Sequence, residues 1–204
     1  MASSIRRDGE ATRQRLLRAA LELFTTTGFR ATTTPAIAER AGVAEGTIYR
    51  HFPGKEQLLN EVYRAAHRWA AGLVLEPDGS LPPADRLQRI GRRLLEGADR
   101  DPAAARMLLL SREERHLDER SRDAAREFRG ALQQVIASGK SDGVIRAGPA
   151  ELWAAVWLQL VAFAAERIAS REWSPDQPQV AQVLDAAWAA IKAAETGSVP
   201  QRML

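Results

Sequence analysis

The chain has 204 residues, 45% of them hydrophobic, and a formal net charge of +3, which suits one ordinary domain or two small ones with a packed core. It contains no cysteine, so disulfides and thiolate metal sites are excluded. The N-terminus lacks the apolar core of a signal peptide, and no segment approaches the ~20 apolar residues of a membrane span, so we expect a cytoplasmic protein with no membrane partner.

Helices are expected throughout the first 75 residues. Ala, Leu, Arg and Glu dominate the chain, and no sustained alternating run of β-branched residues interrupts them, which favours an all-α fold. Thr34 is the expected N-cap of one short helix, with Pro35 in its first position and Gly42 at its end. The helices of this region are expected at residues 8–26, 35–41, 45–51 and 55–75.

Longer amphipathic helices should follow a loop at residues 76–83. They are expected near residues 83–97, 102–116, 119–138, 149–171 and 176–194, which makes about nine helices in all. The tail from Gly197 lacks periodicity and should be frayed.

Charge is shared unevenly along the chain. Residues 1–55 hold nine Lys and Arg against five Asp and Glu, whereas the remaining 149 residues hold 20 against 21. An N-terminal excess of this kind is expected of a small phosphate-binding module attached to a neutral body. A solvated surface with a few surplus arginines is the alternative interpretation.

The stretch from residue 34 to residue 51 has the layout of a helix-turn-helix, because two short helices flank a turn at Gly42 and follow an amphipathic helix. The residues expected to face inward are Ile37, Ala38, Val43 and Ile48. Those left facing outward or sideways are Glu45, Gly46, Thr47, Tyr49, Arg50 and His51. A helix that enters a major groove ~12 Å wide needs slim residues at its leading end and polar ones along its exposed face.

Residues 29–63, FRATTTPAIAERAGVAEGTIYRHFPGKEQLLNEVY, resemble the DNA-binding segment of the TetR family of bacterial transcriptional repressors. The family pattern runs roughly as Thr-Thr, Ile-Ala, Ala-Gly-Val-Ser, Gly-Thr-Leu-Tyr, His-Phe, Ser-Lys-Glu-Leu. The resemblance implies a helix-turn-helix DNA-binding domain at residues 1–54 and a ligand-binding and dimerisation domain at residues 55–204. Beyond residue 75 it is supported by helix number, helix lengths and total size.

The resemblance also implies contacts with double-stranded DNA, residue by residue. The side chains that would contact phosphates are Thr34, Thr47, Tyr49, His51 and Lys55. Lys55 would add its charge to the free N–H groups of a helix start. Glu45, Gly46 and Tyr49 would lie nearest the base edges. Arg50 would reach either the bases or the backbone.

Three positions depart from the family pattern. Ala44 replaces the usual serine N-cap, a change that typically costs ~1 kcal/mol of helix stability. Glu45 stands where a cation or an amide is common, so it either accepts from a cytosine amino group or faces away as a partner of the helix dipole. Pro35 stands where some relatives carry a base-reading side chain, so its helix is expected only to position the next one.

Large, soft side chains in the second unit suit a cavity for an apolar or amphipathic small-molecule effector. The candidates are Trp69, Met107, Trp153, Trp157 and Phe163, and ordinary core packing is the alternative for each. His67 and His116 have no partner at ligand spacing, so no metal site is expected. No Gly-rich phosphate loop, acid pair or Ser-His-acid set appears, so we expect no cofactor and no enzyme activity.

The last two helices are expected to join two copies of the chain. The segment AELWAAVWLQLVAFAAERIA would be apolar on nearly every side of its helix. Its alanines at 154, 155, 162, 164 and 165 would let another helix approach closely. Burial within one subunit is the alternative. Together with these helices, the resemblance to the TetR family implies a ligand-responsive, homodimeric repressor of a pseudo-palindromic operator. The competing hypothesis is a helical ligand-binding or scaffolding protein that has lost specific DNA binding.

Overall fold

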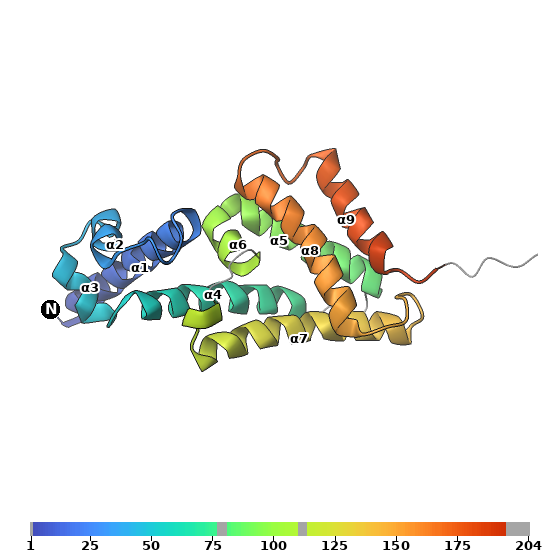
Figure 1. The fold of residues 1–204 in the computed structure, drawn as a ribbon, viewed down its shortest axis with the longest axis horizontal. Helices are drawn as coiled ribbons and strands as arrows, with labels where there is room; N and C mark the ends of the chain where they lie inside the picture. Colours follow the sequence, from blue (N-terminus) through green and yellow to red (C-terminus); the bar gives the residue numbers. More distant parts are fainter. Residues whose placement is uncertain (1, 77–80, 110–113, 195–204) are drawn as a thin grey trace, which may run out of the picture.

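The computed structural model describes residues 2–76, 81–109 and 114–194, with side chains from residue 8 onward except that of residue 114. Within these ranges the chain forms α-helices, one 3-10 helix (η1) and no strand, as predicted for an all-α fold (Figure 1). The helices are α1 Ala2–Thr26, α2 Thr34–Ala41, α3 Glu45–His51, α4 Lys55–Leu75, α5 Pro83–Arg100, α6 Pro102–Leu109, η1 Glu114–His116, α7 Glu119–Ser141, α8 Ala150–Ala169 and α9 Pro178–Ile191.

Several helix boundaries differ from the sequence prediction for local reasons. The N-cap of α2 is Thr33, not Thr34, because the Thr33 hydroxyl accepts from the Ala36 amide at 3.3 Å, which places Pro35 in the second helical position. The predicted helix over 102–116 was wrong at its end: α6 ends at Leu109, 110–113 lie outside the described residues, and 114–116 form η1. The tail predicted to be frayed also lies outside the described residues.

The three N-terminal helices form one end of the molecule, and α4 runs from them into the helical body (Figure 1). One hydrophobic core extends from Leu16 on α1 to Ile191 on α9. Helix α4 packs against α1 on one side and lies along α7 on the other. The end of α9 is tied to the α7–α8 connection by an isolated antiparallel bridge between Ile145 and Lys192. Because α4 belongs to both packing layers, it links the two ends mechanically.

The seam between α4 and α7 carries polar side chains that are bonded to one another, and all of them except Asp118 are buried. The Arg64 guanidinium donates to both carboxylate oxygens of Asp118, at 3.0 and 2.8 Å, and to the Ser121 hydroxyl at 3.1 Å. The Asn60 side chain accepts from the Asp118 amide and from the Ser121 hydroxyl. These bonds satisfy groups that would be costly to bury alone, and they fix the start of α7 against α4.

His67 lies deeper in the same seam. Its ring stacks on Tyr63 with centroids 4.0 Å apart and meets the edge of Phe128 at 6.2 Å. Burial lowers the pKa of His67 to about 4, against the opposing effect of its hydrogen bond with the Tyr63 carbonyl and with a further lowering by Arg129. The imidazole is therefore neutral in the folded protein near neutral pH.

Helix α8 corrects one sequence expectation. By length and composition it could cross a membrane, although the sequence analysis expected no segment of that kind. Such a helix alone is weak evidence for a membrane, because core helices of soluble proteins pass the same test. Helix α8 packs against α5, α6, α7 and α9. The alanines expected to admit a second subunit are mostly buried inside this one: Ala154, Ala162, Ala164 and Ala165.

Candidate nucleic-acid interface

The turn between α2 and α3 is set by Gly42. This residue adopts φ +67° and ψ 40°, a left-handed conformation in which a Cβ is unfavourable. Its amide donates to the Glu39 carbonyl at 3.0 Å, and the Val43 amide donates to the Ala38 carbonyl at 3.0 Å. Ile48 then points into the core with no exposed surface. The predicted inward positions are confirmed: Ile37, Ala38 and Ile48 are buried and Val43 is half-buried.

The opposite side of α3 is open. Glu45, Gly46 and Arg50 are exposed, 56% of Tyr49 is exposed, and Thr47 and His51 are half-buried. A Cβ added at Gly46 would have no atom within 4 Å, so the leading turn of α3 is slim and unobstructed. Among the described residues, neither the Glu45 carboxylate nor the Arg50 guanidinium has a hydrogen bond or ion pair. These groups are therefore available to a partner.

Helices α2 and α3 present one continuous surface. The Thr34 hydroxyl and the Tyr49 hydroxyl lie 3.2 Å apart and share a hydrogen bond. Because Thr33 caps the helix, the hydroxyl of Thr34 is free to make this contact. Pro35 is exposed beside it. The structure thus brings together the α2 and α3 residues that the sequence analysis assigned to DNA.

Lys55 lies differently from the others. Its ammonium donates to the carbonyls of Phe29, Arg30 and Thr32 at 3.0, 3.3 and 2.9 Å. It also lies over the Phe29 ring, 4.6 Å from the centroid. All three ammonium protons are used to hold the connection between α1 and α2. Lys55 therefore stabilises the loop behind the interface, and its predicted contact with phosphate stays a prediction.

The surplus of basic residues in the first 55 positions is partly internal. Arg40 bonds Glu22 at 2.6 Å, and Arg18 bonds Glu22 at 2.8 Å and Asp101 at 2.7 Å. Hydrogen bonding from Arg40 is the main cause that lowers the pKa of Glu22 and keeps it ionised. Arg30 and Arg50 are exposed, and no described residue forms an ion pair with either. The charge that faces outward near α3 is smaller than the sequence count indicates.

The five predicted effector contacts do not gather in one place. Trp69 is 42% exposed and lines a cavity of about 290 Å³ between α1, α4 and α6. Met107 and Trp157 are buried in the core. Trp153 donates its indole N–H to the Ala147 carbonyl at 3.1 Å. Phe163 is 47% exposed on α8 and meets the edge of the Trp173 ring.

Two further hollows flank α7. One of about 300 Å³ lies between α7 and α8 and is lined by residues such as Leu132, Ala155 and Leu158. The other, of about 190 Å³, lies beside Tyr63 among arginines of α7. No group of three residues able to bind a metal occurs in the described part of the chain. Sequence reasoning missed the Thr33 cap because two adjacent threonines could each cap α2. It missed the anchored Lys55 and the cavity beside α1 because both depend on residues distant in the chain.

Comparison with known proteins supports the helix-turn-helix. Residues 16–62 match the family model described as bacterial regulatory proteins, tetR family. The HTH-type transcriptional repressor KstR2 of Mycobacterium tuberculosis is 36% identical over 77 residues, which cover 37% of this chain and 38% of that protein. The chain spans less than half the length of several curated regulators that it matches.

Solved structures extend the likeness to the whole chain. A crystal structure of a tetR family transcription regulator from Shewanella sp. PV-4 aligns with a TM-score of 0.70 and 26% identity, covering 90% of this chain and 99% of that one. AibR, solved with isovaleryl coenzyme A and operator DNA, aligns with a TM-score of 0.70 and 19% identity over 88% of this chain and 97% of its own. At 19% identity, the alignment with AibR shows only that the two chains share a fold.

Proposed function

We propose that this chain is a homodimeric transcriptional regulator of the tetR family, which represses by occupying a pseudo-palindromic operator. The main support for this proposal is the open side of α3, where Tyr49 and Arg50 are exposed beside the slim turn at Gly46. Such a surface fits a recognition helix in a major groove. The similarity to KstR2, a transcriptional repressor, favours repression as the direction of control.

The docking we propose uses α3 as the recognition helix and α2 as its support. Thr34 and Tyr49, already joined through their hydroxyls, would turn those hydroxyls toward one phosphate. His51 and Thr47 would contact the adjoining backbone. Arg50 has no competing acid among the described residues, so it is free to bind a guanine edge or a phosphate. Glu45 would either accept from a cytosine amino group or stabilise the start of α3.

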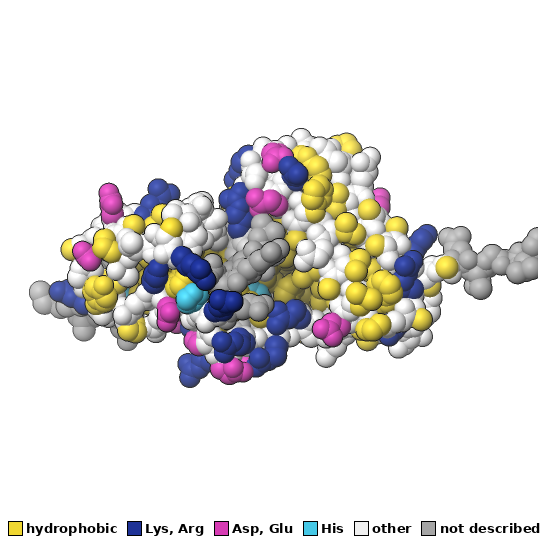
Figure 2. Space-filling view, in the orientation of Figure 1, with side chains coloured by type: hydrophobic (Ala, Val, Ile, Leu, Met, Phe, Trp, Pro, Cys, Tyr) yellow, Lys and Arg dark blue, Asp and Glu magenta, His cyan; other side chains and the backbone are white. Residues whose placement is uncertain are grey.

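A dimer would supply the second recognition helix. The exposed residues Leu152, Ala155, Gln159 and Phe163 are spaced by three or four positions, so they share one face of α8. This stripe is mostly apolar, and Figure 2 shows hydrophobic side chains gathered over this part of the body. Packing the stripe against its symmetry mate would remove apolar surface from water and place the two α3 helices about one DNA turn (~34 Å) apart.

Effector binding in the body would lower operator affinity. AibR, which has the same fold, was solved with both isovaleryl coenzyme A and operator DNA, and this supports a regulator of the same kind here. A ligand that prefers a dimer with wrongly spaced DNA-binding ends would shift the population away from the operator-bound form. In this proposal residues 1–54 read DNA, residues 55–204 bind the effector and the partner subunit, and the protein acts in the cytoplasm.

Selection from random double-stranded DNA with the purified full chain tests this proposal. We expect enrichment of an inverted repeat whose half-sites are centred about 10 base pairs apart or a multiple of that spacing. The double variant Tyr49→Phe/Arg50→Ala should enrich the repeat much more weakly although it folds normally. The competing function, a helical binding module without specific DNA recognition, predicts no enrichment with the unmodified chain either.

A further inference from the structure

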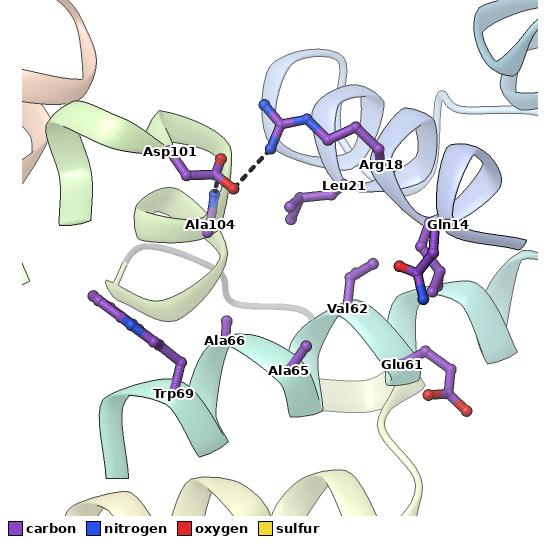
Figure 3. Close-up of a pocket in the computed structure, with 11 residues that line it drawn as sticks. Gln14, Arg18, Leu21, Glu61, Val62, Ala65, Ala66, Trp69, Asp101 and Ala104 are labelled. Carbon is purple, nitrogen blue, oxygen red and sulfur yellow. Dashed lines mark hydrogen bonds and ion pairs between the residues drawn. The ribbon is translucent and has the colours of Figure 1, made fainter. Parts of the chain in front are cut away.

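The cavity beside Trp69 lies where the DNA-binding end meets the body. Its walls come from three helices: Leu17 and Leu21 from α1, Val62, Ala65, Ala66 and Trp69 from α4, and Ala104 from α6. Figure 3 shows Leu21, Val62, Ala66 and Ala104 around one hollow, with Trp69 at one end and Gln14 and Glu61 at the other. Any molecule in this hollow would touch both a helix of the DNA-binding unit and a helix of the body.

The Trp69 indole forms a fixed, flat wall. A Cβ added at Gly97 on α5 would collide with the indole ring, so the ring lies against the bare backbone of α5. Because 42% of the residue is still exposed, the rest of its surface is available inside the hollow. A rigid aromatic face of this kind binds flat rings by stacking and cations through the ring quadrupole.

The rim of the cavity excludes anions. Its charged groups are the carboxylates of Glu61 and Asp101 and the guanidinium of Arg18. Arg18 is already bonded to two acids, Glu22 and Asp101, so it has little attraction left for a third. Glu61 is likewise paired, with Arg13 at 3.4 Å and Arg64 at 3.1 Å. Because no cation at the rim is free to pair with an anion and the walls are apolar, a neutral molecule is favoured, and a single positive charge can still lie over the Trp69 ring. The volume of about 290 Å³ fits a molecule of one or two rings.

A chain of ion pairs leads from the cavity to the helix-turn-helix. Asp101 caps α6 by accepting from the Ala104 amide at 3.1 Å, and it also accepts from Arg18 on α1 at 2.7 Å. Arg18 and Arg40 both donate to Glu22, at 2.8 and 2.6 Å, and Arg40 lies on α2. Ala104 itself lines the cavity. A ligand that moves α6 away from α1 would separate Asp101 from Arg18 and loosen the support of α2.

We propose that this junction cavity binds a small, flat aromatic molecule without negative charge, and that occupancy separates α1 from α6 and weakens DNA binding. The regulatory half of this proposal rests on the proposed DNA-binding function. The binding half does not, because it follows from the cavity walls and the rim charges. The site is distinct from the hollows beside α7, which share no residue with it.

Calorimetric titration of the full chain tests the binding half without DNA. The probes are 2-naphthylmethanol, 2-naphthylmethylamine and 2-naphthoate, which share one ring system and differ in charge. We expect the alcohol and the amine to bind and the carboxylate to bind at least about tenfold more weakly. Absence of binding by all three probes, or equal affinity for the carboxylate, would overturn the proposal.

Variants locate the site. Ala104→Leu should fill the cavity and weaken binding of 2-naphthylmethanol by about tenfold or more, whereas Ala11→Leu on the exposed part of α1 should leave it unchanged. Trp69→Leu provides a second lining change should Ala104→Leu unfold, and thermal unfolding of each variant reports its folding. Binding that is insensitive to the lining variants would place the probe elsewhere and refute the assignment.

The coupling is tested on a duplex obtained by selection. Saturating 2-naphthylmethanol should lower operator affinity by about fivefold or more in the unmodified chain, and by less than about twofold in Arg40→Met, which breaks the ion-pair chain at a residue outside the cavity. Calorimetry should show the same probe affinity in both proteins. Probe binding with unchanged operator affinity would refute the regulatory half alone, and failure of the selection would refute DNA binding alone.

Discussion

Two helices of this protein carry the same three residue types in opposite surroundings. On α3, Tyr49, Arg50 and His51 are exposed or half-buried. On α4, Tyr63, Arg64 and His67 are buried between α4 and α7, and Tyr63 is only 7% exposed. The α4 set is hydrogen-bonded and stacked within the chain, whereas Arg50 has no ion pair among the described residues.

The difference shows that residue type alone does not identify a binding surface. A buried guanidinium must be paired, because desolvation without a partner is costly, so Arg64 is a structural residue. An exposed guanidinium without a partner costs the fold nothing and can bind a phosphate or a base. If this distinction is correct, matched substitutions on α4 and α3 should change different properties.

The largest contrast should appear in stability at the two arginines. Arg64→Ala removes bonds to Asp118 and Ser121 together with the buried part of the side chain, so we expect a loss of about 2–3 kcal/mol in the free energy of unfolding. Arg50→Ala should change it by less than about 0.5 kcal/mol. Urea denaturation of both variants measures the change in the free energy of unfolding. Equal losses would abolish the distinction between the two helices.

The buried histidine of α4 should make the protein sensitive to acid. The folded pKa of His67, about 4, lies below its ordinary value of about 6.5, so protonation favours the unfolded chain and stability falls as the pH drops from 6.5 toward 4. This residue should account for a loss of about 2 kcal/mol between pH 7 and pH 5.

His67→Phe, which keeps an aromatic ring in the stack, should therefore flatten the stability curve in this range. Parallel urea titrations at several pH values give the comparison, and a His67→Phe curve identical to that of the unmodified chain would contradict it.

The two tyrosines should differ in DNA binding. Tyr49→Phe removes a hydroxyl that we assign to a phosphate, and operator affinity should fall by roughly fivefold, equivalent to about 1 kcal/mol. Tyr63→Phe should leave operator affinity unchanged because its ring lies between α4 and α7. Fluorescence anisotropy with a selected duplex distinguishes them. A loss of affinity in Tyr63→Phe alone would show that the seam, and not α3, controls binding.

The smallest expected effect lies at the start of α3. Thr33 caps α2 and Asp118 caps α7 through side-chain oxygens, whereas Ala44 gives α3 no such bond. Because Ala44 already has extended dihedral angles, Ala44→Ser should stabilise the protein by about 0.5–1 kcal/mol. Thermal unfolding measures the gain. A loss of stability would show that the backbone at residue 44 is constrained by something other than capping.

The helix-turn-helix was predictable because its determinants are local. Gly42 fixes the turn, Pro53 and Gly54 end α3, and the apolar period places Ile37 and Ile48 inside. The helices of the body were also predicted, with boundary errors where a cap or a turn competed with periodicity. Their type was clear because apolar residues recur at helical spacing over long segments.

The roles of individual charged residues were not predictable, because they depend on distant partners. Lys55 bonds the carbonyl of Phe29, which precedes it by 26 positions, and Arg64 bonds Asp118, which follows it by 54. Trp69 faces a cavity while Met107 and Trp157 fill the core, although all three are large and apolar. These roles are decided by how the helices pack, so they cannot be predicted from the local sequence pattern.

The central claim is that the exposed side of α3 binds DNA, and the salt dependence of operator affinity for Arg50→Ala tests it most directly. Affinity of the unmodified chain should fall steeply between about 50 and 300 mM salt, roughly with the number of phosphates bound. If Arg50 binds a phosphate in each subunit, its removal should weaken binding and reduce the logarithmic slope by about two for a dimer. If it reads a base, affinity should fall with the slope kept. Unchanged affinity and slope would contradict the account.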